Sequence, residues 1–326
     1  MSFIVYIVLA IVIVALIVGL YQKSTNAICT SKKRLDGKTA IVTGGTAGMG
    51  LETAMDFAER GARVIIACPF QREGEDALKL ITDKTGNKDV VFKLLDLSSL
   101  TSTRKFAADI LDTEKRLDIL INNAGVGTVD KTLTDDGMSF IMQVNYFGPF
   151  LLTLLLLPLL NKTGTISEPA RIVNMSSVLH NFGFINFNRI NDTKYLFPLQ
   201  FYSNSKLCFI LFAHELSKKL KGNVVVNCVD PGYVGTRIFD SAGTIFAPIL
   251  IIFALLFFKT AWYGAQTTIY AALDRDAGKV SGQLFKNCQL SRAKRSAYND
   301  ETSQKLWNKS ISLVGLRSEE LEQCFQ

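Results

Sequence analysis

The chain has 326 residues, with 36 basic and 29 acidic side chains and a formal net charge of +7. Hydrophobic residues make up 48% of it, and its mean hydropathy is positive. These values exclude a disordered chain and a small disulfide-stabilised scaffold, and they leave room for one or two domains with a large core. Much of the apolar excess lies at the amino terminus and in a second run near residue 250.

The first 22 residues carry no charge, and residues 3–20 are almost wholly apolar. This 18-residue run is about the minimum that spans a bilayer core as a helix. A cleaved signal peptide would need a basic amino-terminal region and a small-residue cleavage site, and neither is evident. A cleaved signal and a buried core helix remain the alternatives. We predict a transmembrane signal anchor over residues 1–22.

Basic residues follow this segment, and none precedes it: Lys23, Lys32, Lys33 and Arg34 all lie in the predicted basic linker, 23–36. The positive-inside rule then places the rest of the chain in the cytosol, with the endoplasmic reticulum as the expected membrane. The remaining charge is spread out and accompanies no nucleic-acid motif, so we expect a membrane partner and no nucleic acid. The six cysteines are scattered without metal spacing, which predicts reduced packing thiols and no metal.

Short apolar runs alternate with helical periods from residue 37 onward. Strands are expected near residues 39–43, 63–67, 90–94, 118–122, 171–175, 224–229 and 282–285. Helices are expected near residues 49–60, 72–84, 101–115, 136–160, 202–220 and 261–273. Apolar strands separated by amphipathic helices indicate a parallel sheet covered on both faces. We predict an α/β doubly wound parallel sheet, the Rossmann fold, in one domain over residues 37–326.

A glycine-rich turn joins the first strand to the first helix, because residues 39–42 run directly into the segment 43–50, TGGTAGMG. Its glycines permit a tight turn, close approach of the backbone to a pyrophosphate and close packing of helix on sheet, and the helix amino terminus then faces the phosphates. The alternative is that the glycines only form a structural turn. Dinucleotide contacts are expected at Gly44, Thr46, Ala47, Gly48, Met49 and Gly50.

The end of the second strand, residues 64–69, should distinguish NAD from NADP. No acidic residue that would bind a ribose 2′-hydroxyl occurs there before Glu73, whereas Arg72 is close enough to pair with a 2′-phosphate. The sequence therefore favours NADP(H) over NAD(H), with a merely solvated Arg72 as the alternative. Asp96, after the third strand, is expected to accept from the adenine amino group, or else to help cap the next helix at Ser98.

Tyr202 and Lys206 are four residues apart on a predicted helix, so their side chains share one face. A neighbouring ammonium favours the phenolate, and we expect it to lower the pKa of Tyr202 towards working pH, as a general acid or base requires. Ser177 follows the fifth strand, where its hydroxyl would hold a substrate oxygen as charge develops. The alternative is a set of ordinary surface polar residues.

These segments occur in the order found in a known superfamily. Residues 43–50, the NNAG segment 122–125, Asn145, Ser177, the YSNSK segment 202–206 and the Pro-Gly pair 231–232 resemble the short-chain dehydrogenase/reductase superfamily, over about residues 37–315. The resemblance implies hydride transfer between a substrate carbon and nicotinamide, with Tyr202 giving or taking the proton. It also implies that Lys206 bonds the nicotinamide ribose and that Asn145 keeps a water and the lysine in a proton relay.

Further contacts follow from the resemblance. Asn123 and Gly125 would lie beside the cofactor, as would Tyr202 and Lys206, whereas Asn122 would brace the sheet. Thr236 would contact the nicotinamide carboxamide.

On the substrate side, the resemblance favours Ser177 over Ser176 as the catalytic serine. His180 lies just beyond and is expected to touch the substrate, with a loop histidine of no role as the alternative.

A second apolar run, residues 245–258, contains a proline and is too short for a membrane span. It falls where the family places a mobile substrate lid, here about 236–260. A lid that is apolar on nearly every face must contact core, a lipid-like ligand or a membrane surface. Anchor and lid together resemble the retinol dehydrogenase-like branch, and residues 256–272 are also similar to X-linked dehydrogenase/reductase members. Pro69 stands where many members carry arginine, which weakens the assignment of NADP(H).

The sequence therefore predicts a membrane-anchored, cytosol-facing oxidoreductase that transfers a hydride between NADP(H) and a lipophilic alcohol/aldehyde or ketone, retinol/retinal-like. The same chemistry on a steroid or a polyprenol/polyprenal is one alternative. A non-catalytic dinucleotide-binding scaffold is the alternative from another class. A second copy of the chain is kept as a candidate partner, as a homodimer.

Overall fold

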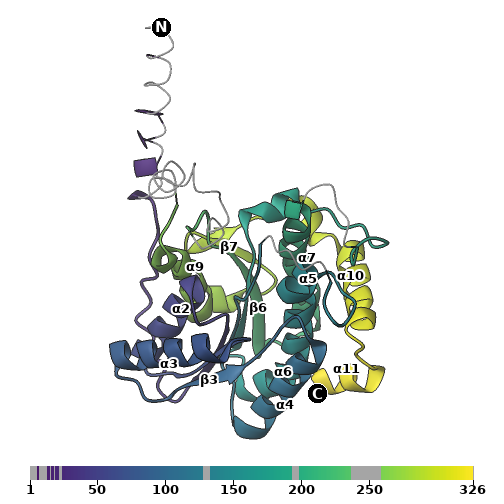
Figure 1. The fold of residues 1–326 in the computed structure, drawn as a ribbon, viewed down its shortest axis with the longest axis horizontal. Coiled ribbons are helices and arrows are strands. Elements are labelled where there is room, and N and C mark those ends of the chain that lie inside the picture. Colours follow the sequence, from purple (N-terminus) through teal and green to yellow (C-terminus); the bar gives the residue numbers. More distant parts are fainter. Residues whose placement is uncertain are drawn as a thin grey trace.

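The computed structural model describes residues 24–127, 133–192, 198–235 and 258–325, together with Tyr6 and scattered positions between 13 and 21. Over these residues, an eight-stranded sheet lies between two layers of helices (Figure 1). The strands are β1 (Thr39–Thr43), β2 (Arg63–Cys68), β3 (Val90–Leu94), β4 (Ile119–Asn122), β5 (Ala170–Met175), β6 (Val224–Asp230), β7 (Leu284–Lys286) and β8 (Gln289–Ser291).

The strand order is β3-β2-β1-β4-β5-β6-β7-β8, with parallel pairing from β3 through β7 and an antiparallel last pair. This order reverses its direction between β1 and β4, which is where doubly wound folds bind ligands. The predicted Rossmann fold is confirmed. The β7–β8 hairpin was not predicted, and its turn carries two non-glycine residues at positive φ, Asn287 and Cys288.

Two layers of helices cover the sheet. One consists of α2 (Gly48–Glu59), α3 (Gln71–Thr85) and α9 (Ala261–Leu273). The other contains α4 (Leu100–Thr113), α6 (Gly148–Thr163), α7 (Pro198–Lys219), α10 (Asp300–Leu313) and α11 (Ser318–Cys324). Side chains along β1 alternate between the two cores, with Ile41 packed in one and Val42 in the other. This two-sided burial explains the continuous apolar strands of the sequence.

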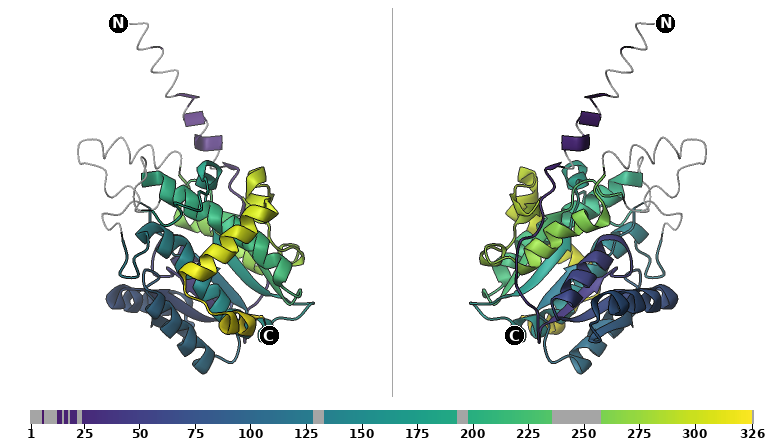
Figure 2. Two further views of the ribbon diagram at one scale, coloured as in Figure 1. Left: turned by 90° about the vertical axis from the view of Figure 1, so that its right-hand side faces the viewer. Right: turned by 90° about the vertical axis from the view of Figure 1, so that its left-hand side faces the viewer.

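Among the described residues, one helical stretch, 140–163, is long and apolar enough to cross a membrane, but 89% of its apolar window is buried in the fold. It comprises α5 (Phe140–Met142), the π-helical η1 (Gln143–Phe147) and α6, and it is a core element. The predicted anchor, 1–22, lies largely outside the described residues. Its described residues are helical and mostly exposed, and they project from the domain (Figure 2). The anchor therefore stays a prediction.

The predicted linker lies against the domain over residues 25–36. The amide of Asn287 accepts from the main-chain N–H of Ala27 at 2.9 Å and donates to the carbonyl of Thr25 at 2.9 Å. Further along, the Arg60 guanidinium donates to two main-chain carbonyls of the linker, at 2.8 and 3.0 Å. These bonds fix the path by which the chain enters the sheet.

Candidate active site

The predicted site residues gather at one edge of the sheet. The carboxyl ends of parallel strands point the same way, so the segments that follow β1, β4, β5 and β6 lie side by side. These are the glycine turn after Thr43, the segment around Gly125, the serines that follow Met175, and the turn after Asp230.

The turn after β1 leaves its main chain open to a ligand. Gly44 and Gly48 have positive φ values of 64° and 55°. A Cβ on Gly50 would lie 2.2 Å from the carbonyl oxygen of Gly44, so only glycine allows this approach. Helix α2 begins at Gly48, where Ala47 offers no side-chain cap and the first turn carries no acid. Its first N–H groups and positive dipole end therefore suit an anionic phosphate.

Two asparagines after β4 hold this edge together. The Asn123 amide donates to the carbonyls of Thr43 at 3.0 Å and Gly44 at 3.2 Å, so it fixes the shape of the glycine turn. Asn122 is fully buried and donates to the side chain of Asn174 on β5 at 2.8 Å. Asn122 thus braces the sheet as expected, and the Asn123 side chain is directed at the turn.

The structure brings Ser177 and Tyr202 together. The side chain of Ser177 lies close enough to Tyr202 on α7 to lower the pKa of its phenol. The rival Ser176 is buried and donates its hydroxyl proton to the carbonyl of Lys206 at 3.0 Å. Ser177 is therefore the serine that reaches the tyrosine, and Ser176 ties β5 to α7.

Lys206 lies one helical turn beyond Tyr202 and is only 2% exposed. Its Nζ donates to the carbonyl of Met175 at 2.9 Å and lies 5.3 Å from the centroid of the Tyr202 ring. Burial disfavours the ammonium and lowers the pKa of Lys206 to about 8.

The expected lowering of the Tyr202 pKa is wrong for this arrangement. Burial raises the pKa of Tyr202 above its ordinary value, and the nearby Ser177 side chain only opposes that rise. Lys206 bonds its Nζ to a carbonyl of β5, and desolvation of the buried phenol is the largest effect on the pKa of Tyr202. Tyr202 therefore holds its proton at neutral pH, which suits a proton donor.

Asn145 and Gly125 complete this cluster. Asn145 lies on η1, where its Oδ1 accepts from the main-chain N–H of Val126 at 2.7 Å and its Nδ2 donates to the Val126 carbonyl at 2.9 Å. The same amide donates to Ser205 Oγ at 3.2 Å, next to Lys206. A Cβ on Gly125 would lie 3.3 Å from Lys206 Nζ, so the glycine leaves room beside the ammonium.

The predicted cofactor contacts Arg72 and Asp96 lie in different surroundings. Arg72 lies in the first turn of α3 with its side chain 94% exposed and 4.0 Å from Asp76, so its guanidinium is accessible to a phosphate. Asp96 accepts from both the main-chain N–H and the hydroxyl of Ser98, at 2.8 and 2.7 Å. Asp96 thus makes a local contact with Ser98, whereas the cap of α4 is Ser99, whose hydroxyl accepts from the main-chain N–H of Ser102. Thr236 and most of the predicted lid, 236–260, lie outside the described residues.

His180 is buried beside Ser177, with its Nδ1 2.6 Å from the Ser177 carbonyl oxygen. Since a carbonyl only accepts, Nδ1 carries the proton and Nε2 is an acceptor. Nε2 has no hydrogen-bond partner within the described ranges. Burial lowers the pKa of His180, so the imidazole is neutral.

Known proteins match the chain over most of its length. Residues 38–244 match the short chain dehydrogenase family. Retinol dehydrogenase 11 of Mus musculus is 42% identical over 296 residues, which cover 90% of this chain and 91% of that protein. The chain belongs to the short-chain dehydrogenase family. Retinol dehydrogenase 12 of Bos taurus is 41% identical over 298 residues, covering 90% and 92% of the two chains.

A solved structure agrees with this assignment. The Pseudomonas aeruginosa RhlG/NADP active-site complex has a TM-score of 0.62 and 26% identity, and the match covers 78% of this chain and 95% of that chain. This short-chain dehydrogenase belongs to the retinol dehydrogenase-like branch and is an NAD(P)-dependent oxidoreductase that acts on CH–OH groups.

One residue of this edge was not singled out from the sequence. Asp230 ends β6 and is 2% exposed, and its carboxylate pairs with Lys286 on β7 at 3.3 Å. The available signal was a charge closing an otherwise almost apolar run, VVVNCVD. Its partner could not be inferred, because the pairing of β6 with β7 joins residues far apart in sequence.

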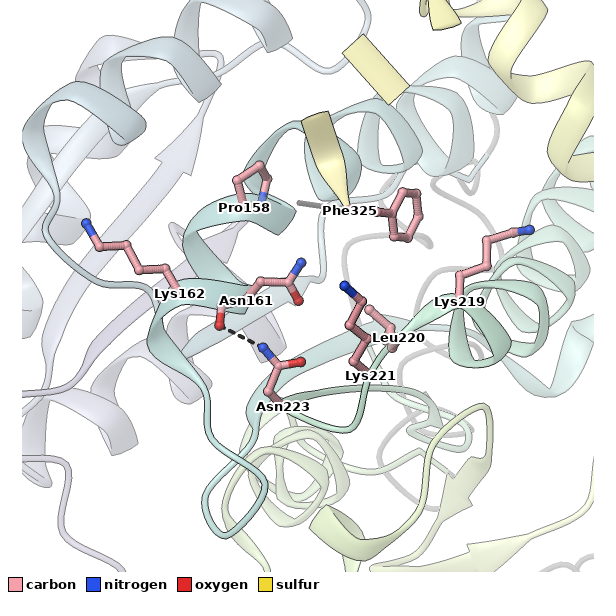
Figure 3. Close-up of a pocket in the computed structure, with 8 residues that line it drawn as sticks. All are labelled: Pro158, Asn161, Lys162, Lys219, Leu220, Lys221, Asn223 and Phe325. Carbon is pink, nitrogen blue, oxygen red and sulfur yellow. Dashed lines mark hydrogen bonds between the residues drawn. The ribbon is translucent and has the colours of Figure 1, made fainter. Parts of the chain in front are cut away.

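Figure 3 shows the residues that line a second, small pocket, whose volume is about 180 Å³. It is lined by Pro158 and Lys162 near the end of α6, Lys219 at the end of α7 and Phe325, which follows α11. The Asn223 amide, just ahead of β6, donates to a main-chain carbonyl of α6 there at 2.7 Å. The pocket is therefore at the amino edge of β6, opposite the edge that carries Ser177 and Tyr202.

Proposed function

We propose that this short-chain dehydrogenase is a membrane-anchored, cytosol-facing enzyme that transfers a hydride between NADP(H) and a lipophilic alcohol/aldehyde or ketone, retinol/retinal-like. The juxtaposition of Ser177, Tyr202 and Lys206, beside a glycine turn that leads into the open end of α2, carries the proposal. The dinucleotide, when bound, supplies or accepts the hydride.

The chain's own residues would handle the proton. In reduction, the Tyr202 hydroxyl gives its proton to the carbonyl oxygen as the carbon gains hydride, and the alcohol results. Ser177 hydrogen-bonds that oxygen while it carries negative charge. Lys206 bonds the ribose and favours the phenolate left on Tyr202, and Asn145 holds the neighbouring loop and α7 in place.

Cofactor contacts are proposed along the same edge. The main chain of residues 44–50 would hold the pyrophosphate, with Asn123 fixing the turn. The exposed guanidinium of Arg72, at the start of α3, supports NADP(H), since its positive charge attracts a 2′-phosphate. Asp96 has one carboxylate oxygen bound to Ser98 and would use the other for the adenine amino group.

A lipophilic substrate is supported by the names of the relatives, retinol dehydrogenases 11 and 12, and by the apolar run 245–258. Ser177 and His180 would face it, because both follow β5 at the carboxyl edge of the sheet. The neutral imidazole of His180, with an acceptor at Nε2, would contact the substrate without adding charge.

A substrate panel tests the activity. The purified full chain in nanodiscs is supplied with retinal, a steroid ketone or a polyprenal, each with NADPH and, in parallel, with NADH. We expect the fastest NADPH oxidation with retinal and a lower rate with NADH. Turnover of the steroid or polyprenal alone would redirect the substrate assignment, and equal rates with both dinucleotides would remove the NADP(H) preference.

Membrane anchoring needs its own test. The exposed apolar side chains on the described residues of the amino-terminal helix, such as Ile17 and Leu20, support burial in a bilayer. Deleting residues 1–22 should release the protein from microsomes. Retention of the truncated chain would assign membrane binding to the 245–258 run. Protection of the catalytic domain from protease in sealed endoplasmic reticulum vesicles would overturn the cytosolic orientation.

A further inference from the structure

Asp230 is a carboxylate held at the buried carboxyl edge of the sheet. It ends β6 and is 2% exposed, a position where an unpaired charge is costly. Its Oδ1 accepts from the main-chain N–H of Gly232 at 3.0 Å, and its Oδ2 lies 3.3 Å from Nζ of Lys286. Lys286 stands at the paired position on β7 and is about half exposed. The ion pair therefore connects a buried carboxylate to solvent.

The register of the strands places this carboxylate next to the catalytic edge. Met175 of β5 pairs with Val229 of β6, so the serines after β5 are neighbours of Asp230. Tyr202 lies close to the same strand end, because Lys206 Nζ donates to the carbonyl of Met175 at 2.9 Å and lies 5.3 Å from the centroid of the Tyr202 ring. Burial accounts for most of the rise in the Tyr202 pKa, and the negative charge of Asp230 adds to that rise.

The charges around Asp230 come from several elements. Burial lowers the pKa of His180, and Asp230 opposes that effect; burial also lowers the pKa of Lys259, again opposed by Asp230. The groups that face Asp230 or Tyr202 are Lys286 on β7, Lys259 ahead of α9, His180 after β5, Lys206 on α7 and, against His180, Lys294 after β8. Lys286 is the cation whose Nζ pairs directly with the carboxylate.

We propose that Asp230 and Lys286 form a positioning ion pair that sets the net charge beside the Tyr202 hydroxyl, and thereby the pH range in which the enzyme reduces carbonyls. This role rests on the proposed function of Tyr202. A carboxylate near Tyr202 disfavours its phenolate and keeps the proton on the hydroxyl, whereas the Lys286 ammonium offsets that carboxylate. The balance between these two charges therefore sets how firmly Tyr202 holds the proton that it gives up in reduction.

Two substitutions should move the pH profile in opposite directions. Asp230→Asn keeps an oxygen to accept from Gly232 but removes the negative charge, so the alkaline limb of kcat/KM for NADPH-dependent reduction should move to lower pH by about one unit. Lys286→Met leaves the carboxylate unbalanced, so the limb should move to higher pH. The double variant should fall between them, and Lys286→Arg should retain the wild-type limb. Asp276→Asn removes one partner of an exposed ion pair with Lys279 and is the control.

The outcomes separate the ion pair from the proposed function. If both single variants lose activity without moving the limb, or move it in the same direction, the pair is only structural and the inference fails. If Tyr202→Phe keeps wild-type turnover, the proposed function itself fails. An inactive Tyr202→Phe with an unmoved limb in Asp230→Asn overturns the inference alone. Should Asp230→Asn not fold, Lys286→Met against Lys286→Arg still decides, since neither changes the buried carboxylate.

Discussion

The two halves of the site at the carboxyl edge of the sheet use different groups. After β1, the main chain makes the site: glycines at positive φ, an uncapped helix start and an asparagine that holds the turn. After β5 and β6, buried side chains make it, including the ammonium of Lys206 and the carboxylate of Asp230. The first half depends on space and the second on charge. Changes of shape should therefore damage cofactor binding, and changes of charge should alter proton transfer.

The largest effect is expected at the proton donor. Tyr202→Phe removes the hydroxyl that would give its proton to the substrate oxygen, and turnover should fall by about 10²–10⁴-fold. NADPH affinity, measured by quenching of protein fluorescence, should change little because the glycine turn is intact. Tyr270→Phe on α9 is the control and should keep its activity. A large loss of NADPH affinity in Tyr202→Phe would contradict the division between the two halves.

A methyl group in the glycine turn should weaken cofactor binding, which is the task of the first half of the site. Gly50→Ala places a Cβ 2.2 Å from the Gly44 carbonyl oxygen and 2.5 Å from Asn123 Nδ2. Relief of that clash distorts the turn at about 1–3 kcal/mol, so NADPH should bind about tenfold or more weakly. In Gly222→Ala, a positive-φ glycine with open space around it, stability should fall by about 1 kcal/mol with NADPH affinity unchanged. Isothermal titration calorimetry would report both affinities, and equal losses would refute the steric argument.

Burial of Lys206 should make stability depend on pH. Its pKa is about 8 in the folded chain against an ordinary value of 10.5. Between those values the unfolded chain holds a proton that the folded chain has released, so the free energy of unfolding rises with pH across that window. The slope is at most about 1.4 kcal/mol per pH unit. Urea denaturation at pH 8 and pH 10 should show this slope in the wild type and its loss in Lys206→Met. Equal slopes would mean that Lys206 stays charged in the fold.

The smallest effect is expected at the exposed arginine. Arg72→Gln should raise KM for NADPH by about two- to fivefold and leave KM for NADH unchanged, since an exposed ion pair contributes about 1 kcal/mol or less. Arg72→Lys retains the charge and should behave nearly as the wild type. Initial rates with both dinucleotides would measure this, and parallel changes in both KM values would exclude a 2′-phosphate contact.

Much of the fold could be predicted because short stretches of sequence determine its strands and helices. The expected strand at 39–43 matches β1, which is buried throughout, since strands buried on both faces form continuous apolar runs. The expected strand at 90–94 matches β3, which is only partly buried. Strand β8 gave no such signal because Gln289 and Leu290 are exposed. Helix α10 was missed although Leu306, Trp307 and Ser310 show helical spacing and Asn299 caps it, because its apolar positions are sparse among polar ones.

The site was predictable where spacing along one helix fixes proximity, and not where it depends on burial or strand pairing. The four-residue interval between Tyr202 and Lys206 was enough to place them together. The direction of the Tyr202 pKa was predicted wrongly because desolvation cannot be seen in a sequence. Asp230 was overlooked because its partner, Lys286, becomes a neighbour only through the pairing of β6 and β7.

The hydrogen bonds of Asn287 to Thr25 and Ala27 affect how the enzyme would reach its substrate. Asn287 directly follows β7, on the same edge of the sheet as Ser177, so the amino-terminal segment leaves the domain beside the site. With residues 1–22 in a bilayer as proposed, only a few residues separate this fastening from the membrane. The site would then lie at a fixed distance from the bilayer surface. A sparingly soluble substrate dissolved in the bilayer would reach it at a raised local concentration.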